Sequence, residues 1–181
     1  MVRTKSTLIV ILFLSFYFLK AQENPVVRPS PTALTSIRYK DSYVKITYCQ
    51  PRKRNREIYG KLVPYNEVWR TGANEATEIT FTKDVFIKDT LIPAGTYSIF
   101  TIPGKEIWTV ILNKDLGLWG SYSYNMKLDA FRFEIPVQQT DGYVFESFTI
   151  QFDHRHSVAD ILLLWDKTKI SIPLKFIEPK P

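Results

Sequence analysis

The chain has 181 residues, of which 14% are aromatic, and a formal net charge of +6 at pH 7. Residues 1–21 carry three basic side chains and no acidic one, so residues 22–181 have a net charge of only +3. This mild balance, with one short basic run at residues 52–56, argues against nucleic acid as a partner. A solvated basic loop is the simpler interpretation of that run.

The amino-terminal residues predict export. Arg3 and Lys5 precede an uncharged, mostly apolar run at residues 8–19, and Ala21 offers a small side chain at a cleavage position. This is the pattern of a secretory signal peptide, and the run is too short to span a bilayer as a helix. We therefore expect residues 1–21 to be removed, leaving a periplasmic or extracellular protein without a stable membrane span. An uncleaved anchor is the alternative.

Cys49 is the only cysteine. An exported domain with one cysteine has no internal disulfide and depends on its apolar core for stability. The residues after the signal form about one domain by size. Cys49 ends a strand-like run and lacks a histidine nearby in the sequence, so buried filler is a better interpretation than a nucleophile.

Short alternating segments dominate the chain after an extended, proline-containing lead-in at residues 22–32. We expect strands, in chain order, at residues 33–39, 43–49, 75–82, 85–88, 96–102, 107–113, 129–137, 148–152, 161–165 and 170–174. Residues 153–160 predict a polar turn. Residues 62–69 contain Pro64 and predict a short turn of helix or an irregular crossover.

These nine or ten strands, without an amphipathic helix of normal length, predict an all-β fold. We expect a single-domain antiparallel β-sandwich or flattened barrel over residues 33–175, with one short irregular or helical crossover. A tail follows at residues 176–181. Large aromatic side chains suit the gap between two sheets.

The densest polar chemistry lies between Trp69 and Glu75. Arg70 offers five donors in a rigid fork that fits a carboxylate, a phosphate or sugar hydroxyls. Thr71 and Asn74 are candidate hydrogen-bonding groups for a ligand, and Trp69 is a candidate stacking surface for a sugar ring. Residues 69–75 are therefore the first candidate site.

Two other roles for this run remain open. Arg70 and Glu75 could pair under the sheet edge and stabilise the crossover, because structural ion-pair networks also cluster charges. Alternatively, Glu75 could act as an acid or base with a second carboxylate, Glu67 or Glu78, as in a glycoside hydrolase.

The aromatic loop at residues 119–124 is the second candidate site. Trp119 and Tyr122 lie in a glycine-containing loop that could form a stacking platform for a glycan. The alternative is a loop folded over the open end of the sandwich, burying its own rings. If the loop lies beside Arg70 and Glu75, the two segments form a pocket with an apolar wall and a few convergent polar groups.

His154 and His156 are the only histidines, and a metal site normally needs three or four ligands, so a solvated turn is the preferred interpretation. The sequence contains no nucleophile elbow, phosphate loop or dinucleotide fingerprint. We therefore expect no metal and no cofactor, and we assign no catalytic residue.

Three segments together resemble a known family. Residues 63–77 read VPYNEVWRTGANEAT, residues 93–104 read PAGTYSIFTIPG, and Trp119-Gly120 opens the aromatic loop. They resemble an exported bacterial family known as domain of unknown function number 2911, over about residues 30–173. The resemblance implies export and a compact β fold, but no activity. Gln50 stands where members usually have arginine, which counts against any site that needs that arginine.

The favoured hypothesis is an exported, non-enzymatic binding module for a glycan or a small anionic ligand. The alternatives are a hydrolase that uses Glu75 with a second carboxylate, and a purely structural sandwich that binds protein partners. The expected ligand-binding residues are Trp69, Arg70, Thr71, Asn74, Glu75, Trp119 and Tyr122.

Overall fold

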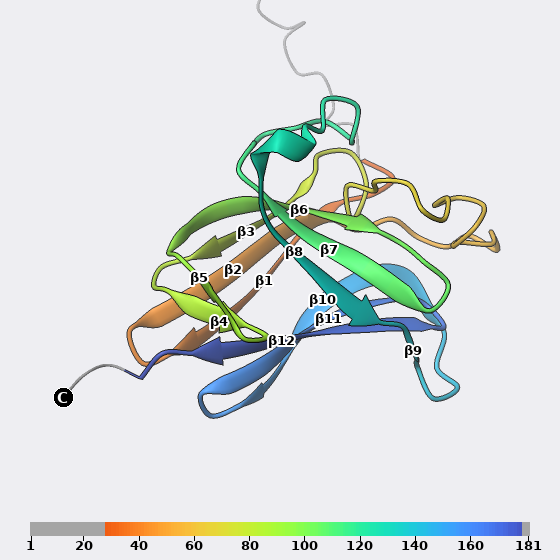
Figure 1. Ribbon diagram of the computed structural model, residues 1–181. Helices are drawn as coiled ribbons and strands as arrows, with labels where there is room; N and C mark the ends of the chain where they lie inside the picture. Colours follow the sequence, from red (N-terminus) through yellow and green to blue (C-terminus); the bar gives the residue numbers. More distant parts are fainter. Residues whose placement is uncertain (1–27, 179–181) are drawn as a thin grey trace, which may run out of the picture.

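Twelve strands form two antiparallel layers in the computed structural model, which describes residues 28–178 (Figure 1). The first sheet has the order β1-β2-β3-β6-β7-β8, and the second has the order β10-β11-β12-β4-β5, with β9 paired to β12. Neither sheet closes on itself, so the fold is a β-sandwich, as expected. The strands are β1 (Thr32–Tyr39), β2 (Ser42–Cys49), β3 (Thr77–Phe81), β4 (Val85–Ile87), β5 (Thr90–Ile92), β6 (Gly95–Ile102), β7 (Ile107–Asn113), β8 (Asp129–Pro136), β9 (Gln138–Gln139), β10 (Phe145–Arg155), β11 (Val158–Asp166) and β12 (Thr168–Phe176).

Alternation explains most of these strands. In β2 the side chains of Val44, Ile46 and Tyr48 are buried, and those of Lys45 and Thr47 between them are half-buried. Successive side chains of a strand point to opposite faces, so one face of β2 meets the core while β1 and β3 satisfy its backbone on both edges. The sequence therefore determines which face of β2 turns inward.

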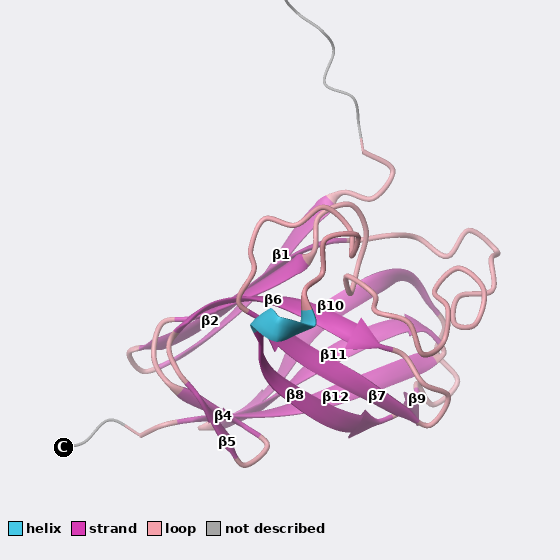
Figure 2. Cartoon of the chain, turned by 45° about the horizontal axis from the view of Figure 1, so that its top comes forward, coloured by secondary structure: helices cyan, strands magenta, loops and turns pink. Residues whose placement is uncertain are grey.

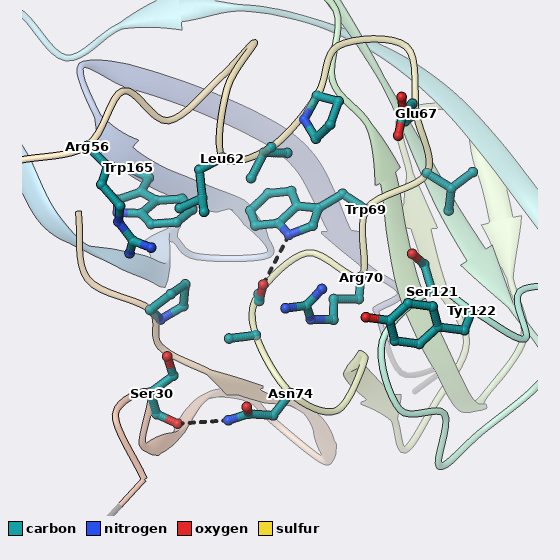
Figure 3. Close-up of a pocket in the computed structure, with 16 residues that line it drawn as sticks. Ser30, Arg56, Leu62, Glu67, Trp69, Arg70, Asn74, Ser121, Tyr122 and Trp165 are labelled. Carbon is teal, nitrogen blue, oxygen red and sulfur yellow. Dashed lines mark hydrogen bonds between the residues drawn. The ribbon is translucent and has the colours of Figure 1, made fainter. Parts of the chain in front are cut away.

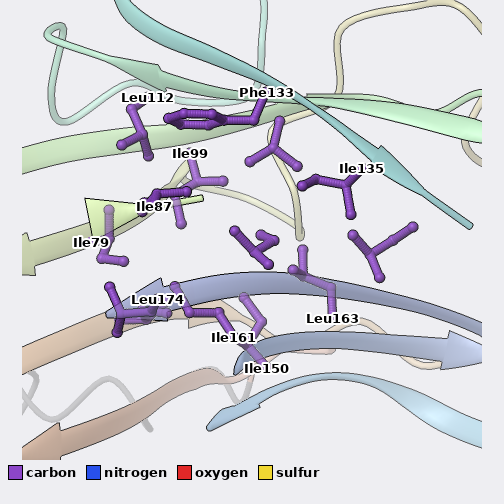
Figure 4. Packing of buried hydrophobic residues seen from close by; sticks show 14 of the residues in the cluster. Ile79, Ile87, Ile99, Leu112, Phe133, Ile135, Ile150, Ile161, Leu163 and Leu174 are labelled. Carbon is purple, nitrogen blue, oxygen red and sulfur yellow. The ribbon is translucent and has the colours of Figure 1, made fainter. Parts of the chain in front are cut away.

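Aliphatic side chains from both sheets fill the space between the layers (Figure 4). Next to them lies a group of aromatic rings: Tyr59, Trp69, Trp108, Phe148 and Trp165. The rings of Trp69 and Trp165 stack with centroids 6.0 Å apart, and Trp69 meets Trp108 edge to face at 6.1 Å. Burial of such large rings contributes strongly to stability, so Trp69 serves first as a core residue.

Two expectations about the strands need correction, and the form of the crossover is decided. The short strands β5 and β9 were not predicted, because two or three residues are too few to show an alternation of apolar and polar side chains. Residues 153–160 are not a polar turn, since β10 continues to Arg155 and β11 begins at Val158. The segment at 62–69 forms turns and isolated bridges, so it is the irregular crossover and not the helical turn of the two forms expected. Within residues 28–178 the helical structure is one 3-10 turn, η2 (Met126–Leu128).

Two long loops, at residues 50–76 and 114–128, lie on the same side of the sandwich, where β1 also begins (Figure 2). The second loop packs over the outer face of β6 and β7, where Leu118 and Tyr124 contact a small cluster that contains Phe100 and Ile111. Within the described residues, no helix is long and apolar enough to cross a membrane. The expected signal peptide and most of the lead-in lie outside the described residues.

Candidate functional site

The loop that follows Trp69 is attached to the first sheet by backbone hydrogen bonds. The amide of Trp69 donates to the carbonyl of Thr101 in β6 (2.7 Å), and the amide of Thr101 donates back to Trp69 (2.9 Å). Trp69 thus extends the sheet by one bridge, and its indole N–H donates to the carbonyl of Gly72 at 3.0 Å. These bonds fix the position from which Arg70 projects.

The backbone of this loop is strained at two residues. Thr71 and Asn74 have φ angles of 55° and 56°, a region that costs a β-branched residue such as Thr71 most. The surrounding bonds hold Thr71 there: its hydroxyl lies 3.0 Å from that of Thr101, and its carbonyl accepts from the hydroxyl of Thr77 at 2.6 Å. Non-glycine residues in such backbone occur preferentially at functional sites.

Gly72 is required for close packing rather than for an unusual φ. A Cβ atom at this position would lie 2.9 Å from the carbonyl oxygen of Cys49 and 3.3 Å from the hydroxyl of Thr77. Any larger residue would push the loop away from the end of β2. The glycine therefore keeps the loop against the sheet.

Arg70 lines a cavity of about 430 Å³. In Figure 3 its guanidinium lies between the Trp69–Asn74 loop and the side chains of Ser121 and Tyr122. Its Nε atom is buried and has no hydrogen-bond partner among the described residues, which also provide no ion pair for Arg70. The lining residues are Ser30, Pro51, Arg56, Leu62, Val63, Pro64, Glu67, Val68, Trp69, Arg70, Gly72, Ala73, Asn74, Ser121, Tyr122 and Trp165.

Glu75 does not pair with Arg70, so the structural pair considered from the sequence is wrong. Its carboxylate accepts a hydrogen bond from Arg28 at 2.7 Å and one from the thiol of Cys49 at 3.2 Å. The bond from Arg28 lowers the pKa of Glu75 below its ordinary value. Glu75 lines a different, smaller cavity of about 250 Å³, together with Cys49 and Glu78.

The aromatic loop lies beside this segment, as the pocket hypothesis requires. Trp119 forms an antiparallel bridge with Glu75, and the amide of Gly120 donates to the carbonyl of Asn74 at 2.8 Å. The loop divides into two parts: Leu118 and Tyr124 pack inward against the sheet, whereas Trp119 and Tyr122 are exposed. The inward-facing residues cover the outer face of the sheet and not the open end of the sandwich.

Buried Asn113 holds both ends of the loop at residues 114–128, which contains the aromatic loop. Its amide nitrogen donates to the carbonyl of Asn125 (3.0 Å) and to the carboxylate of Asp129 (2.7 Å), and its amide oxygen accepts from the backbone of Asp115 (2.8 Å). The side chain of Asn113 therefore joins the first and last turns of the loop to β7 and β8.

Of the seven residues expected to bind a ligand, four line the larger cavity: Trp69, Arg70, Asn74 and Tyr122. Glu75 lines the smaller one, Thr71 is fully buried, and Trp119 lies outside both cavities. Asn74 donates its side-chain amide to the carbonyl of Ser30 at 3.1 Å, so it also fixes the lead-in against the loop.

Sequence reasoning missed Arg56 and Ser121 as residues of the larger cavity. Arg56 belongs to the basic run that was interpreted as a solvated loop, and its Nε and one terminal nitrogen donate to the carbonyls of Lys53 and Arg52. Only the folded crossover turns this arginine toward the cavity. The residues described contain no cluster of three or more side chains suited to a metal ion.

Comparison with known proteins agrees with the family resemblance. The model of a family described as "Protein of unknown function (DUF2911)" matches residues 30–174, which is most of the chain and includes all of the residues that line the two cavities. The searches of curated proteins and of solved structures found no match.

Proposed function

Starting from the fact that the chain belongs to the DUF2911 family, whose description gives no function, we propose that the domain is a non-enzymatic binding module. It holds a small anionic ligand in the cavity lined by Arg70. The observation that carries this proposal is the buried Nε of Arg70, which has no acceptor among the described residues.

A buried donor without an acceptor costs free energy, and an anionic ligand would provide the acceptor. Arg56 lines the same cavity and adds a second guanidinium, and Glu67 is the one carboxylate among the lining residues. A planar guanidinium binds a carboxylate or a phosphate through two parallel hydrogen bonds. The volume of about 430 Å³ lies within the range of small-molecule sites.

A hydrolase that uses Glu75 has less support. The general acid of a glycoside hydrolase needs a raised pKa, and the pKa of Glu75 is lowered by Arg28. Glu67 lines the other cavity, and Glu78 accepts a hydrogen bond from the amide of Gly117 at 2.9 Å. Glu67 therefore does not share a cavity with Glu75; Glu78 does, but its carboxylate is already bound by a backbone amide.

Export of this module to the periplasm or the extracellular space is part of the proposal and rests on the signal pattern in residues 1–21. Cleavage after Ala21, read from the amino-terminal sequence of the protein recovered from its native host, tests it. A mature protein that still begins at Met1 would contradict it.

The binding proposal is tested by titration calorimetry with inorganic phosphate, succinate, citrate and glucuronate as separate probes. We expect at least one probe to bind the wild type, and Arg70→Gln to weaken that binding by about 10-fold or more, as for a hydrogen bond to a charged group. Arg155→Gln is the matched control, because Arg155 is exposed on the β10–β11 hairpin and pairs with Asp153. Equal affinities in both variants, or no binding of any probe to the wild type, would overturn the proposal.

A further inference from the structure

Tyr122 forms part of the cavity wall while remaining 87% exposed. In Figure 3 its ring lies next to Arg70, with Ser121 beside it. Leaving a large aromatic side chain in water forgoes the stabilisation that its burial would give. A tyrosine beside an unpaired guanidinium is therefore well placed to contact a ligand.

Gly120 fixes the position of the Tyr122 ring. A Cβ atom at Gly120 would lie 2.7 Å from Cε2 and 2.8 Å from Cδ2 of Tyr122, so the ring packs directly against the glycine backbone. The hydrogen bond from the amide of Gly120 to Asn74 ties this point to the loop that carries Arg70. One edge of the exposed ring therefore lies against a backbone position that is bonded to the loop of Arg70.

The cavity is also lined by polar side chains that suit sugar hydroxyls: Ser121 next to this ring, and Asn74 and Ser30 farther from it (Figure 3). A saccharide presents an apolar ring face together with hydroxyl groups, and it satisfies both kinds of surface. An aromatic acid would match the ring and the guanidinium but would offer no hydroxyl groups to these polar side chains.

We infer that the anionic ligand of this cavity is an acidic saccharide, with its carboxylate on Arg70 and its sugar ring against Tyr122. This inference rests on the proposed binding function and specifies the class of ligand. The shared chemistry, a carboxylate beside a flat apolar face, is also that of an aromatic acid, so the test includes one.

Four probes separate the two parts of the recognition in calorimetric titrations of the wild type. Methyl β-D-glucuronide has the ring and the carboxylate, gluconate has the carboxylate and hydroxyls without a ring, methyl β-D-glucoside has the ring alone, and benzoate is an aromatic acid. We expect methyl β-D-glucuronide to bind at least about 5-fold more tightly than each of the others, which corresponds to burial of about 40 Å² of apolar surface between a sugar face and the tyrosine ring.

Substitutions then assign the preference to the Tyr122 ring. Tyr122→Ala removes the ring, and Gly120→Ala displaces it; each should remove the preference for the glucuronide over gluconate. Tyr122→Phe should keep the preference. Gly117→Ala is the control for backbone strain, because Gly117 has a φ of 70° against 71° for Gly120, and a Cβ atom at Gly117 would have no neighbour within 4 Å. Gly117→Ala should therefore leave the preference unchanged.

The outcomes distinguish this inference from the function on which it rests. If gluconate and the glucuronide bind equally and Tyr122→Ala changes neither, the acidic-saccharide inference is wrong while anion binding stands. If benzoate binds more tightly than the glucuronide, the ligand class is an aromatic acid and the inference is again wrong. If none of the three acids binds, the acidic-saccharide inference is wrong, and the anion-binding function fails as well if phosphate, succinate and citrate also do not bind.

Discussion

Arg70 and Glu75 belong to one loop, yet they line different cavities and do not pair. Glu75 is bound by Arg28 from the lead-in and by the thiol of Cys49. Arg70 has no carboxylate partner among the described residues, and its Nε has no acceptor there. The guanidinium of Arg70, which the sequence suggested as the partner of Glu75 in a structural ion pair, is therefore the group that we propose binds a ligand.

Replacing Arg70 by methionine should leave stability unchanged or raise it by about 1 kcal/mol, because an apolar side chain of similar length removes a buried donor that has no partner. Urea unfolding measures this difference. In contrast, Arg132→Met should lose about 1 kcal/mol, since Arg132 donates to Asp129 and Tyr124. A loss of more than about 2 kcal/mol in Arg70→Met would assign Arg70 a structural role.

The strain at Thr71 predicts an unusual order of stabilities. Both Thr71→Ala and Thr71→Gly lose the contact with Thr101, but only glycine relieves the left-handed backbone, which costs other residues roughly 1–2 kcal/mol. We expect Thr71→Gly to be more stable than Thr71→Ala by about 1 kcal/mol in thermal unfolding. At Thr80 in β3 the backbone is not strained, and glycine only increases the conformational entropy of the unfolded chain. Thr80→Gly should therefore be less stable than Thr80→Ala. If the glycine variant were the more stable one at both positions, strain at Thr71 would not be the explanation.

Asn113→Ala should cost about 2–3 kcal/mol, because it removes the three hydrogen bonds that this buried side chain makes to residues 115, 125 and 129. Hydrogen exchange at the Asp115 amide, which donates to Asn113, should accelerate together with the rest of residues 114–128. Asn125→Ala is the comparison, since Asn125 is exposed and its side chain caps only η2. Unchanged exchange in Asn113→Ala would show that the loop is held by its apolar contacts alone.

The ion pair between Arg28 and Glu75 should make a pH-dependent contribution to stability. Because the pKa of Glu75 is lower in the folded chain than its ordinary value of 4.5, the contribution is present above pH 4.5 and disappears as the pH falls through the folded value. Both side chains are about half exposed, so the effect is small. An NMR titration should show the pKa of Glu75 rising toward 4.5 in Arg28→Gln; an unchanged pKa would exclude this pair as the cause.

Trp119 should account for the quenchable part of the tryptophan fluorescence. It is 58% exposed, whereas Trp69, Trp108 and Trp165 are no more than 7% exposed. Acrylamide should therefore quench one accessible component, which Trp119→Phe removes without loss of stability. Quenching that persists in Trp119→Phe would mean that the aromatic group between the sheets opens to solvent.

Local residue patterns were sufficient to establish the class of fold and most of the strands. Alternation of apolar and polar residues, as in β2 and β8, specifies both the strand and its inward face, because neighbouring side chains of a strand point to opposite sides. The unbroken apolar run at residues 161–165 likewise predicted a fully buried strand, and each of those side chains is buried.

The electrostatic partners and the cavities depend on how distant segments come together in the folded chain. Arg28 and Glu75 are 47 residues apart in the chain, and they meet only because the lead-in lies along the loop after Trp69. Arg56 and Tyr122 come from different loops that the sandwich gathers on one side. Local patterns indicate which face of a segment meets the core, but not which distant segment lies beside it. The sequence therefore identified Arg70 as a candidate, and only the fold showed that it has no partner among the described residues.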